Sequence, residues 1–559
     1  MSRTFSTGVQ RSEPSNVGNV GLADGETIIG EQAPEPLTVE GIKARRAKAG
    51  KLIAPTASYS DSDMFKSPQA YEKPKARRWD HLLSPESIAR KPCVLKLAAK
   101  HLKKPGLISL GGGLPSAENF PIDELSMRIP QPPHFGSSTS ATPSGASSGS
   151  QEVTIGKHDT TEKEDAVYDL SIALNYGQSI GSAQLLRWVT EHTELVCRPP
   201  YADWRCALTI GSTGALESAL RMFCDRARND SILTEEYSFS TALETAAPLG
   251  IKVFGVRMDE QGLLPGSLDE ILSGWDEKAR GGARKPTVLY TVPSGQNPTG
   301  ATQGEQRRRD IYETCRRHDV FILEDEPYYF LQMPPYKPAA GGPNTSDPAE
   351  QTVDAFLQGL IPSLLSMDID GRVLRLDSFS KVVVPGSRVG WVTASEQVVE
   401  RYIRHAECAS QGPSGIAQVL MHKLVDESWG HEGYLRWLMR LRGEYARRRD
   451  VLLGACERHL PAGVVGWVPP AAGMFLWLSV DHTQHPEASS KSILEIEEAI
   501  FDSCIDKGVL ACRGSWFRAE QERPPSGLFF RVTFAAASEG DMDVAIERFG
   551  AAVRESFGI

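Results

Sequence analysis

One lysine stands in a setting that suggests covalent chemistry. Lys381 closes the run Asp377-Ser378-Phe379-Ser380-Lys381, which follows the short apolar run 373–376. A lysine amine held at the end of a strand can form a Schiff base with a carbonyl compound. Arg388 stands seven residues further on, and its planar guanidinium suits a phosphate or a carboxylate. Lysine and arginine are most often solvated, so it is the setting that makes these two residues candidates.

Polar or aromatic groups also follow the other short apolar runs. In an open α/β sheet ligands bind beyond the carboxyl ends of the strands, so these groups would share one rim. They are Ser212 and Thr213 before a predicted helix, Tyr237 after the run 232–234, Asn297 in the turn 293–300, and Asp325 and Tyr328 after the run 320–323. Singly, each has an ordinary explanation as a helix N-cap, a turn or a core residue. Together with the lysine and the arginine, they are the groups that pyridoxal phosphate needs.

The elements that would position these groups are short strands alternating with helices. Seven apolar runs predict strands: 207–210, 232–234, 253–256, 288–292, 320–323, 373–376 and 389–392. The stretch 214–228 between them is amphipathic and predicts a helix. This alternation predicts an α/β fold, with a three-layer α/β/α large domain around a mainly parallel sheet. The runs 474–478 and 528–534 predict strands of a smaller α+β domain.

These patterns divide the chain into five parts. Residues 1–80 are rich in Ser, Gly, Pro and charge and are predicted to be a disordered extension, in which the basic patch 43–48 is interpreted as a solvated charge cluster. Residues 81–125 are expected to contribute to the small domain and the substrate site. Residues 126–165 are predicted to be a mobile, low-complexity surface insertion. The cofactor-binding large domain is expected over 166–400 and the small domain over 401–559.

Composition excludes several classes of protein. The chain has 559 residues and a formal net charge of −10, which argues against nucleic acid as a partner. Its nine cysteines form no C-x-x-C pair, so neither a metal site nor a disulfide framework is indicated, and a reducing compartment such as the cytoplasm is favoured. No apolar run approaches the roughly 20 residues that span a bilayer. Arg3 and Arg11, with no acid before Glu13, leave a mitochondrial presequence open.

Six stretches of the sequence resemble a known family. They are Ile108-Ser109-Leu110-Gly111-Gly112-Gly113-Leu114-Pro115, Tyr290-Thr291-Val292-Pro293 with Asn297-Pro298-Thr299-Gly300, Glu324-Asp325-Glu326-Pro327-Tyr328-Tyr329-Phe330-Leu331-Gln332, Asp377-Ser378-Phe379-Ser380-Lys381, Pro470-Ala471-Ala472-Gly473-Met474-Phe475-Leu476-Trp477, and Phe530-Arg531-Val532-Thr533-Phe534. The chain resembles the class I/II, fold-type-I aminotransferases, and within them the fungal aromatic-amino-acid and kynurenine/aminoadipate subgroup. The similarity covers about residues 84–555 and is interrupted by the Ser/Gly-rich segment.

The resemblance implies a role for each candidate residue. Lys381 would hold pyridoxal phosphate as a Schiff base, and Asp325 would pair with the pyridine nitrogen. Asn297 and Tyr328 would bond the 3′ oxygen and Tyr237 would lie against the ring, while Ser212, Thr213, Ser378, Ser380 and Arg388 would hold the phosphate together with Tyr176 from the neighbouring subunit of a homodimer. The substrate would contact Arg531, Asn297, Gly113 and Lys96, with Arg531 clamping the α-carboxylate. Lys96 stands where relatives can have an arginine. The lysine ammonium is a single point charge, whereas the guanidinium of arginine is a planar, forked donor.

The implied reaction is transamination between an aromatic L-amino acid and 2-oxoglutarate. Phenylalanine, tyrosine and tryptophan are the expected donors, with kynurenine and 2-aminoadipate as further candidates. Another pyridoxal-phosphate enzyme of the same fold stays open, such as a carbon–sulfur lyase or a cyclopropane-forming synthase. A ligand-sensing regulator with an aminotransferase-like domain is disfavoured, because residues 1–80 lack the apolar periodicity of a helix-turn-helix and the chain is acidic.

Overall fold

The computed structural model describes most of the chain from residue 37 to residue 559. Outside the described residues lie 1–36, 99–100, 102–103, 105–107, 109, 112, 134, 136–148, 162–166 and 338–350. In the part that is described, no helix is both long and apolar enough to cross a membrane.

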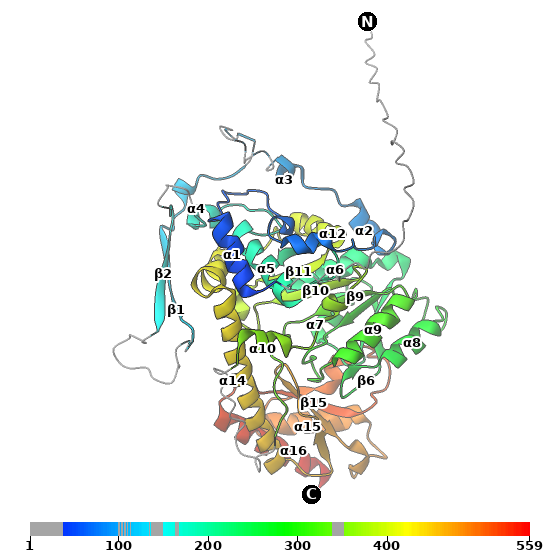
Figure 1. The fold of residues 1–559 in the computed structure, drawn as a ribbon. Helices are drawn as coiled ribbons and strands as arrows, with labels where there is room; N and C mark the ends of the chain where they lie inside the picture. Colours follow the sequence, from blue (N-terminus) through cyan, green and yellow to red (C-terminus); the bar gives the residue numbers. More distant parts are fainter. Residues whose placement is uncertain are drawn as a thin grey trace, which may run out of the picture. The chain divides into compact units, whose positions relative to one another are not determined.

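A seven-stranded sheet forms the centre of the fold (Figure 1), with the strand order β3-β11-β10-β9-β8-β4-β5. The strands are β3 (Trp204–Thr209), β4 (Ser231–Glu235), β5 (Lys252–Val256), β8 (Val288–Thr291), β9 (Phe321–Asp325), β10 (Val373–Ser378) and β11 (Gly390–Ser395). From β5 to β10 neighbouring strands are parallel, whereas β11 pairs antiparallel with both β10 and β3. All seven predicted strands and the mainly parallel sheet are confirmed.

Helices cover both faces of this sheet because its strands are apolar on both sides. In β9, Phe321 and Leu323 belong to one core and Ile322 to the other, as the alternation of side chains along a strand requires. The first core includes residues of α6 (Ser212–Phe223) and α12 (Glu396–Cys408), and the second includes residues of α8 (Pro265–Ser273) and α9 (Glu305–Arg317). The predicted three-layer arrangement is therefore confirmed, and the predicted helix 214–228 is α6, which ends earlier, at Phe223.

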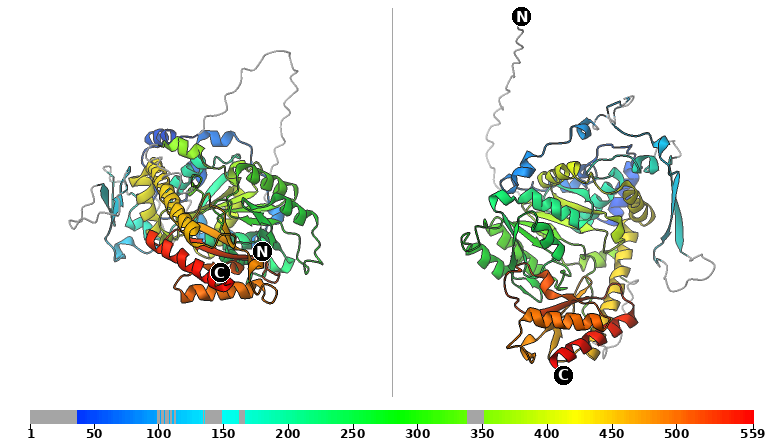
Figure 2. Two further views of the ribbon diagram at one scale, coloured as in Figure 1. Left: turned by 90° about the horizontal axis from the view of Figure 1, so that it is seen from below. Right: turned by 180° about the vertical axis from the view of Figure 1, so that it is seen from behind.

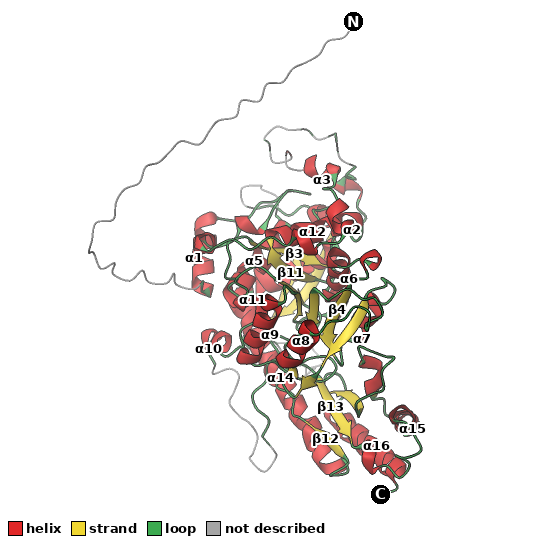
Figure 3. Cartoon of the chain, turned by 90° about the vertical axis from the view of Figure 1, so that its right-hand side faces the viewer, coloured by secondary structure: helices red, strands yellow, loops and turns green. Residues whose placement is uncertain are grey.

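A second sheet lies in the C-terminal part of the chain (Figure 3). It is antiparallel, with the order β12-β13-β15-β14, and its strands are β12 (Val465–Trp467), β13 (Phe475–Val480), β14 (Cys512–Arg513) and β15 (Leu528–Thr533). The predicted strands 474–478 and 528–534 are β13 and β15. One face of the sheet packs against α15 (Ile493–Asp506) and α16 (Glu539–Phe557), and α16 packs on α14 (Gly430–His459). The other face presents Trp477 and Arg531, which are paired in register.

The remaining elements are short, apart from α5. The helices are α3 (Val94–Ala98), α4 (Leu170–Ala173), α5 (Ala183–Val196), α7 (Ser240–Ala246), α10 (Val353–Gln358), α11 (Leu364–Met367) and α13 (Gly415–His422), and the strands are β6 (Met258–Asp259) and β7 (Gly262–Leu263).

The predicted disorder of residues 1–80 is wrong for residues 37–80, while residues 1–36 lie outside the description. Helix α1 (Val39–Ala49) contains the basic patch, and there Arg46 pairs with Glu191 and Asp426, whose side chains are almost completely buried. Trp79 is also fully buried. Composition missed this order because the partners of Arg46 are distant in sequence and cannot be identified from the segment itself.

Two further predictions about the N-terminal third are corrected. The segment predicted as a mobile insertion, 126–165, contains most of a hairpin, in which β1 (Glu124–Pro130) and β2 (Ser150–Gly156) pair antiparallel along their whole length (Figure 2). The placement of 81–125 in the small domain is wrong for α2 (Pro85–Ala89), which packs on α6 and α12 instead, and stays a prediction for the rest of the segment. The predicted division at residue 400 falls inside α12, which packs on β3 and β11, and the domain boundaries stay a prediction.

Candidate active site

Lys381 follows the end of β10 and is half-buried. Burial lowers the pKa of its amine, and the positive charges of Arg531 and Arg388 lower it further, whereas Asp325 raises it. A lowered pKa favours the neutral amine, which is the form that attacks a carbonyl. The same charges show that Arg531, Arg388 and Asp325 all lie within electrostatic range of Lys381.

Asp325 ends β9, the strand that pairs in parallel with β10, so the two strand ends lie side by side. The hydroxyl of Tyr290 donates to Oδ2 of Asp325 at 2.9 Å. The other oxygen, Oδ1, is buried and accepts no hydrogen bond of good geometry from the described residues. Burial raises the pKa of Asp325 to about 6, although the bond from Tyr290 and the nearby hydroxyl of Ser212 lower it. A buried carboxylate with a free oxygen is well suited to a ligand N–H group that carries positive charge.

A cradle for an anion lies where β3 meets α6. The first turn of α6 carries Ser212 and Thr213, and the buried hydroxyl of Ser212 lies close enough to Asp325 to lower its pKa but forms no hydrogen bond of good geometry in the described structure. Across from it, Nη1 of Arg388 donates to Oγ of Ser380 at 3.1 Å, and Ser380 is bonded to Ser378 at 2.8 Å.

A glycine allows these two sides of the cradle to approach. Gly211 has a φ of 83°, and a Cβ atom at this position would collide with the guanidinium of Arg388. Hydroxyls, a helix start and an arginine fork together suit a phosphate.

Arg531 reaches this region from β15 of the second sheet. Its Nη1 donates to Oδ1 of Asn297 at 2.7 Å, and its Nη2 lies 3.3 Å from Sγ of Cys512. Phe475 and Phe517 also contact its guanidinium, with ring centroids 4.4 and 4.7 Å away. An arginine fixed in this way is suited to clamp a carboxylate.

The two tyrosines predicted beside the cofactor are both buried. Burial raises the pKa of Tyr328, and the charge of Asp325 raises it further. The carbonyl of Tyr237 accepts a hydrogen bond from Nε2 of Gln296, the residue before Asn297. The ring of Tyr237 packs edge-on against Trp477 and Phe529. Stacking of Tyr237 on a cofactor ring stays a prediction.

Three predicted residues lie apart from this group, and we call them the Tyr176 face. Tyr176 and Gly113 are exposed, and Nζ of Lys96 donates to Oγ of Ser179 at 2.5 Å and to the carbonyl of Gly177 at 3.3 Å. Lys96 is therefore bound to the loop that carries Tyr176. Its predicted place in the substrate site is not seen within a single chain.

Several residues of the site were not anticipated from the sequence. Tyr290 stands in a quoted motif, but its bond to Asp325 depends on the pairing of β8 with β9. Phe475 also stands in a quoted motif, whereas Cys512 and Phe517 come from a segment that carried no recognised pattern.

The predicted residues that do meet, which we call the cofactor edge, are Lys381, Asp325, Ser212, Ser378, Ser380, Arg388, Asn297 and Arg531. They offer an amine, a free carboxylate oxygen and an anion cradle, as a phosphorylated pyridine aldehyde requires. The described residues contain no cluster of His, Cys, Asp or Glu that could hold a metal ion.

Comparison with known proteins agrees with this geometry. Residues 160–549 match the family model "Aminotransferase class I and II". The chain belongs to this family. It is therefore a pyridoxal-phosphate enzyme, and it shares the family's fold. When bound, the cofactor supplies an electron-accepting ring that makes the Cα–H bond of an amino acid acidic.

Individual members of the family with named substrates are similar to this chain over most of its length. The aminotransferase is 44% identical over 486 residues to an aromatic amino acid aminotransferase of Schizosaccharomyces pombe, covering 85% of this chain and 98% of the relative. It is 34% identical over 469 residues to an L-tyrosine:2-oxoglutarate aminotransferase of Serpula lacrymans, covering 80% and 85%. The crystal structure of aminotransferase Aro8 from Candida albicans matches 87% of this chain and 100% of its own, with a TM-score of 0.78 and 38% identity.

Proposed function

We propose that this aminotransferase moves the amino group of an aromatic L-amino acid to 2-oxoglutarate. The names of the two curated relatives support this choice of substrates. So does the aromatic surround of Arg531, where Phe475 and Phe517 contact the guanidinium and Trp477 is its partner in register. An aromatic amino acid would place its carboxylate on Arg531 and its ring among apolar side chains.

The residues of the cofactor edge, together with Tyr328 and Thr213, would each have a separate role set by position. Lys381 would hold the cofactor and move the substrate proton, and Asp325 would keep the pyridine nitrogen protonated. Asn297 and Tyr328 would bond the 3′ oxygen, while Arg531 would orient the substrate. Ser212, Thr213, Ser378, Ser380 and Arg388 would hold the phosphate. The buried oxygen Oδ1 of Asp325, beside the strand that leads to Lys381, is the observation that carries this assignment.

A homodimer with shared active sites is part of the proposal. Tyr176 is 65% exposed, although a phosphate-binding tyrosine should be enclosed once its site is complete. The neighbouring N-terminal segment also exposes apolar side chains, namely Val94, Leu95, Ile108 and Leu110, at 75%, 71%, 86% and 94%. Apolar groups exposed together are typical of an interface. A second copy of the chain would cover them and bring its own phosphate cradle to Tyr176.

The proposal is tested by a matrix of amino donors and 2-oxo acids with the purified enzyme. We expect the highest rates with phenylalanine, tyrosine or tryptophan paired with 2-oxoglutarate. Release of ammonia or pyruvate without a 2-oxo acid acceptor would instead identify a lyase or a synthase. The absence of turnover, combined with ligand-dependent DNA binding, would identify a regulator.

Cytoplasmic location also remains a proposal. It is supported by the nine cysteines, all of which are free. Fractionation of cells that express the tagged chain tests the cytoplasmic location. Recovery with mitochondria would favour the alternative that the N-terminus is a mitochondrial presequence.

A further inference from the structure

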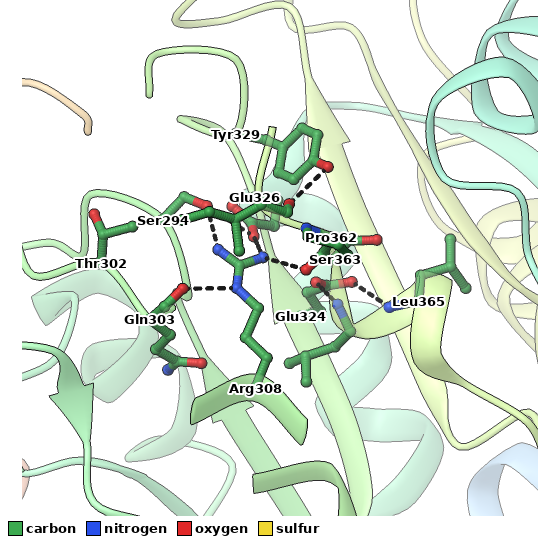
Figure 4. A network of polar contacts seen from close by, with 12 residues as sticks. Ser294, Thr302, Gln303, Arg308, Glu324, Glu326, Tyr329, Pro362, Ser363 and Leu365 are labelled. Carbon is green, nitrogen blue, oxygen red and sulfur yellow. Dashed lines mark hydrogen bonds and ion pairs between the residues drawn. The ribbon is translucent and has the colours of Figure 1, made fainter. Parts of the chain in front are cut away.

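A buried arginine lies behind the cofactor edge, on α9 (Figure 4). The guanidinium of Arg308 donates to the carbonyl of Gln303 at 3.0 Å through Nε, to Oε1 of Glu326 at 3.0 Å through Nη1, and to Oγ of Ser294 at 2.8 Å through Nη2. The side chains of Arg308 and Glu326 are both 0% exposed. Nη1 also donates to the carbonyl of Pro362 at 3.4 Å, so one rigid guanidinium joins four acceptors.

A further hydrogen bond closes the triangle, because Oγ of Ser294 donates to Oε1 of Glu326 at 3.1 Å. Ser294 lies three residues before Asn297, and Glu326 directly follows Asp325. The triangle thus ties the turn that carries Asn297 to the strand end that carries Asp325. Burial raises the pKa of Glu326, and the charges of Arg308 and Arg375 oppose this rise.

We propose that Arg308, Glu326 and Ser294 are positioning residues that fix the separation between Asn297 and Asp325. The inference rests on the proposed roles of those two residues at opposite sides of the cofactor ring. A change in their separation would alter the hydrogen bonds to the 3′ oxygen and to the pyridine nitrogen together. Lysine cannot replace Arg308 here, because one ammonium group cannot span these acceptors with the geometry of a planar fork.

A purely structural role must be separated from this one, since breaking a buried ion pair destabilises any fold. The chain offers a matched control in Arg372, which is 1% exposed. Its guanidinium also forms a fork, to the carboxylate of Asp370 and to the carbonyls of Cys315 and Val320. Arg372 directly precedes β10 and so lies at the end of the sheet opposite Lys381.

The experiment compares Arg308→Lys with Arg372→Lys as holoenzymes, by thermal unfolding and by pH titration of the cofactor's visible absorbance. We expect both variants to lose thermal stability. Only Arg308→Lys should move the midpoint of the absorbance titration, by about half a pH unit or more. An unchanged midpoint in Arg308→Lys, or an equal shift in Arg372→Lys, would overturn the positioning role.

A milder pair of variants covers the case in which Arg308→Lys does not fold. Ser294→Ala removes two sides of the triangle, and its control is Ser231→Ala, a buried serine at the start of β4 that donates to the carbonyl of Arg284 instead. The midpoint should move in the first variant and not in the second, and the reverse result would overturn the proposal. Asn297→Ala distinguishes a failure of the proposed role of Asn297 from a failure of the positioning role of the triangle. If it leaves the midpoint unchanged, the proposed role of Asn297 fails, whereas a shift there without one in Ser294→Ala rejects the triangle alone.

Discussion

The cofactor edge and the Tyr176 face differ in how far a single chain builds them. At the cofactor edge, neighbouring strands end together, and Arg388 and Arg531 already bond to Ser380 and Asn297. At the Tyr176 face, Tyr176 is exposed and, among the described residues, Lys96 bonds to the adjacent loop. Sheet topology suffices to assemble the first region, because the hydrogen-bond ladder fixes which strand ends are neighbours. Among the described residues, no hydrogen-bonded strands position the Tyr176 face in the same way.

The largest effect should come from Lys381→Ala. We expect turnover and the visible absorbance of the bound cofactor both to disappear. Lys381 is the lysine of the cofactor edge, and its lowered pKa favours the neutral amine that forms the Schiff base. Lys423→Ala, at a lysine that pairs with Glu427, is a suitable control and should keep both. A coloured and fully active Lys381→Ala enzyme would contradict the assignment of Lys381 as the residue that holds the cofactor.

Asp325→Asn should still bind the cofactor but lose about three orders of magnitude in kcat, or roughly 4 kcal/mol, because an amide does not keep the pyridine nitrogen protonated. Tyr290→Phe, which removes one hydrogen bond to the same carboxylate, should cost about tenfold. Single-turnover kinetics with an aromatic amino acid measure both values. A loss of less than tenfold in Asp325→Asn would contradict its role.

Lys96→Met tests whether the Tyr176 face takes part in substrate choice. If Lys96 binds the distal carboxylate of 2-oxoglutarate, its loss should raise the KM for that acid by roughly ten- to a hundredfold, or about 1.5–3 kcal/mol. The KM for phenylalanine should change much less. Equal weakening of both half-reactions would show that Lys96 only tethers the Tyr176 loop through Ser179.

The smallest signal is expected from mixed dimers. Inactive Lys381→Ala chains and chains inactivated by substitution of Tyr176 should, after subunit exchange, regain up to about a quarter of the wild-type activity. Half of the dimers would be hybrids, each with one intact site of two. Native mass spectrometry confirms exchange. With exchange demonstrated, zero recovery would mean that Tyr176 acts within its own chain and that the two regions are not joined across an interface.

The sequence was most informative where local pattern and topology coincide. Lys381, Asp325 and Asn297 each follow an apolar run, and a parallel sheet brings such positions to one edge. Contacts between segments far apart in sequence could not be anticipated in the same way. Arg46 finds Glu191 and Asp426 only in the folded chain, and the bond from Tyr290 to Asp325 needs the register of two strands. The Arg308 triangle was missed for the same reason, since an arginine on a helix is usually solvated.

Helix α1 also bears on where this enzyme can be shortened. The family match begins at residue 160, which invites truncation at a point well past α1. Such a cut would remove the guanidinium shared by Glu191 and Asp426 and leave these enclosed carboxylates with His431 and Arg187. We therefore expect a chain shortened to the recognised segment to be less stable, and a tag or fusion partner is better attached ahead of Val39 than in place of it.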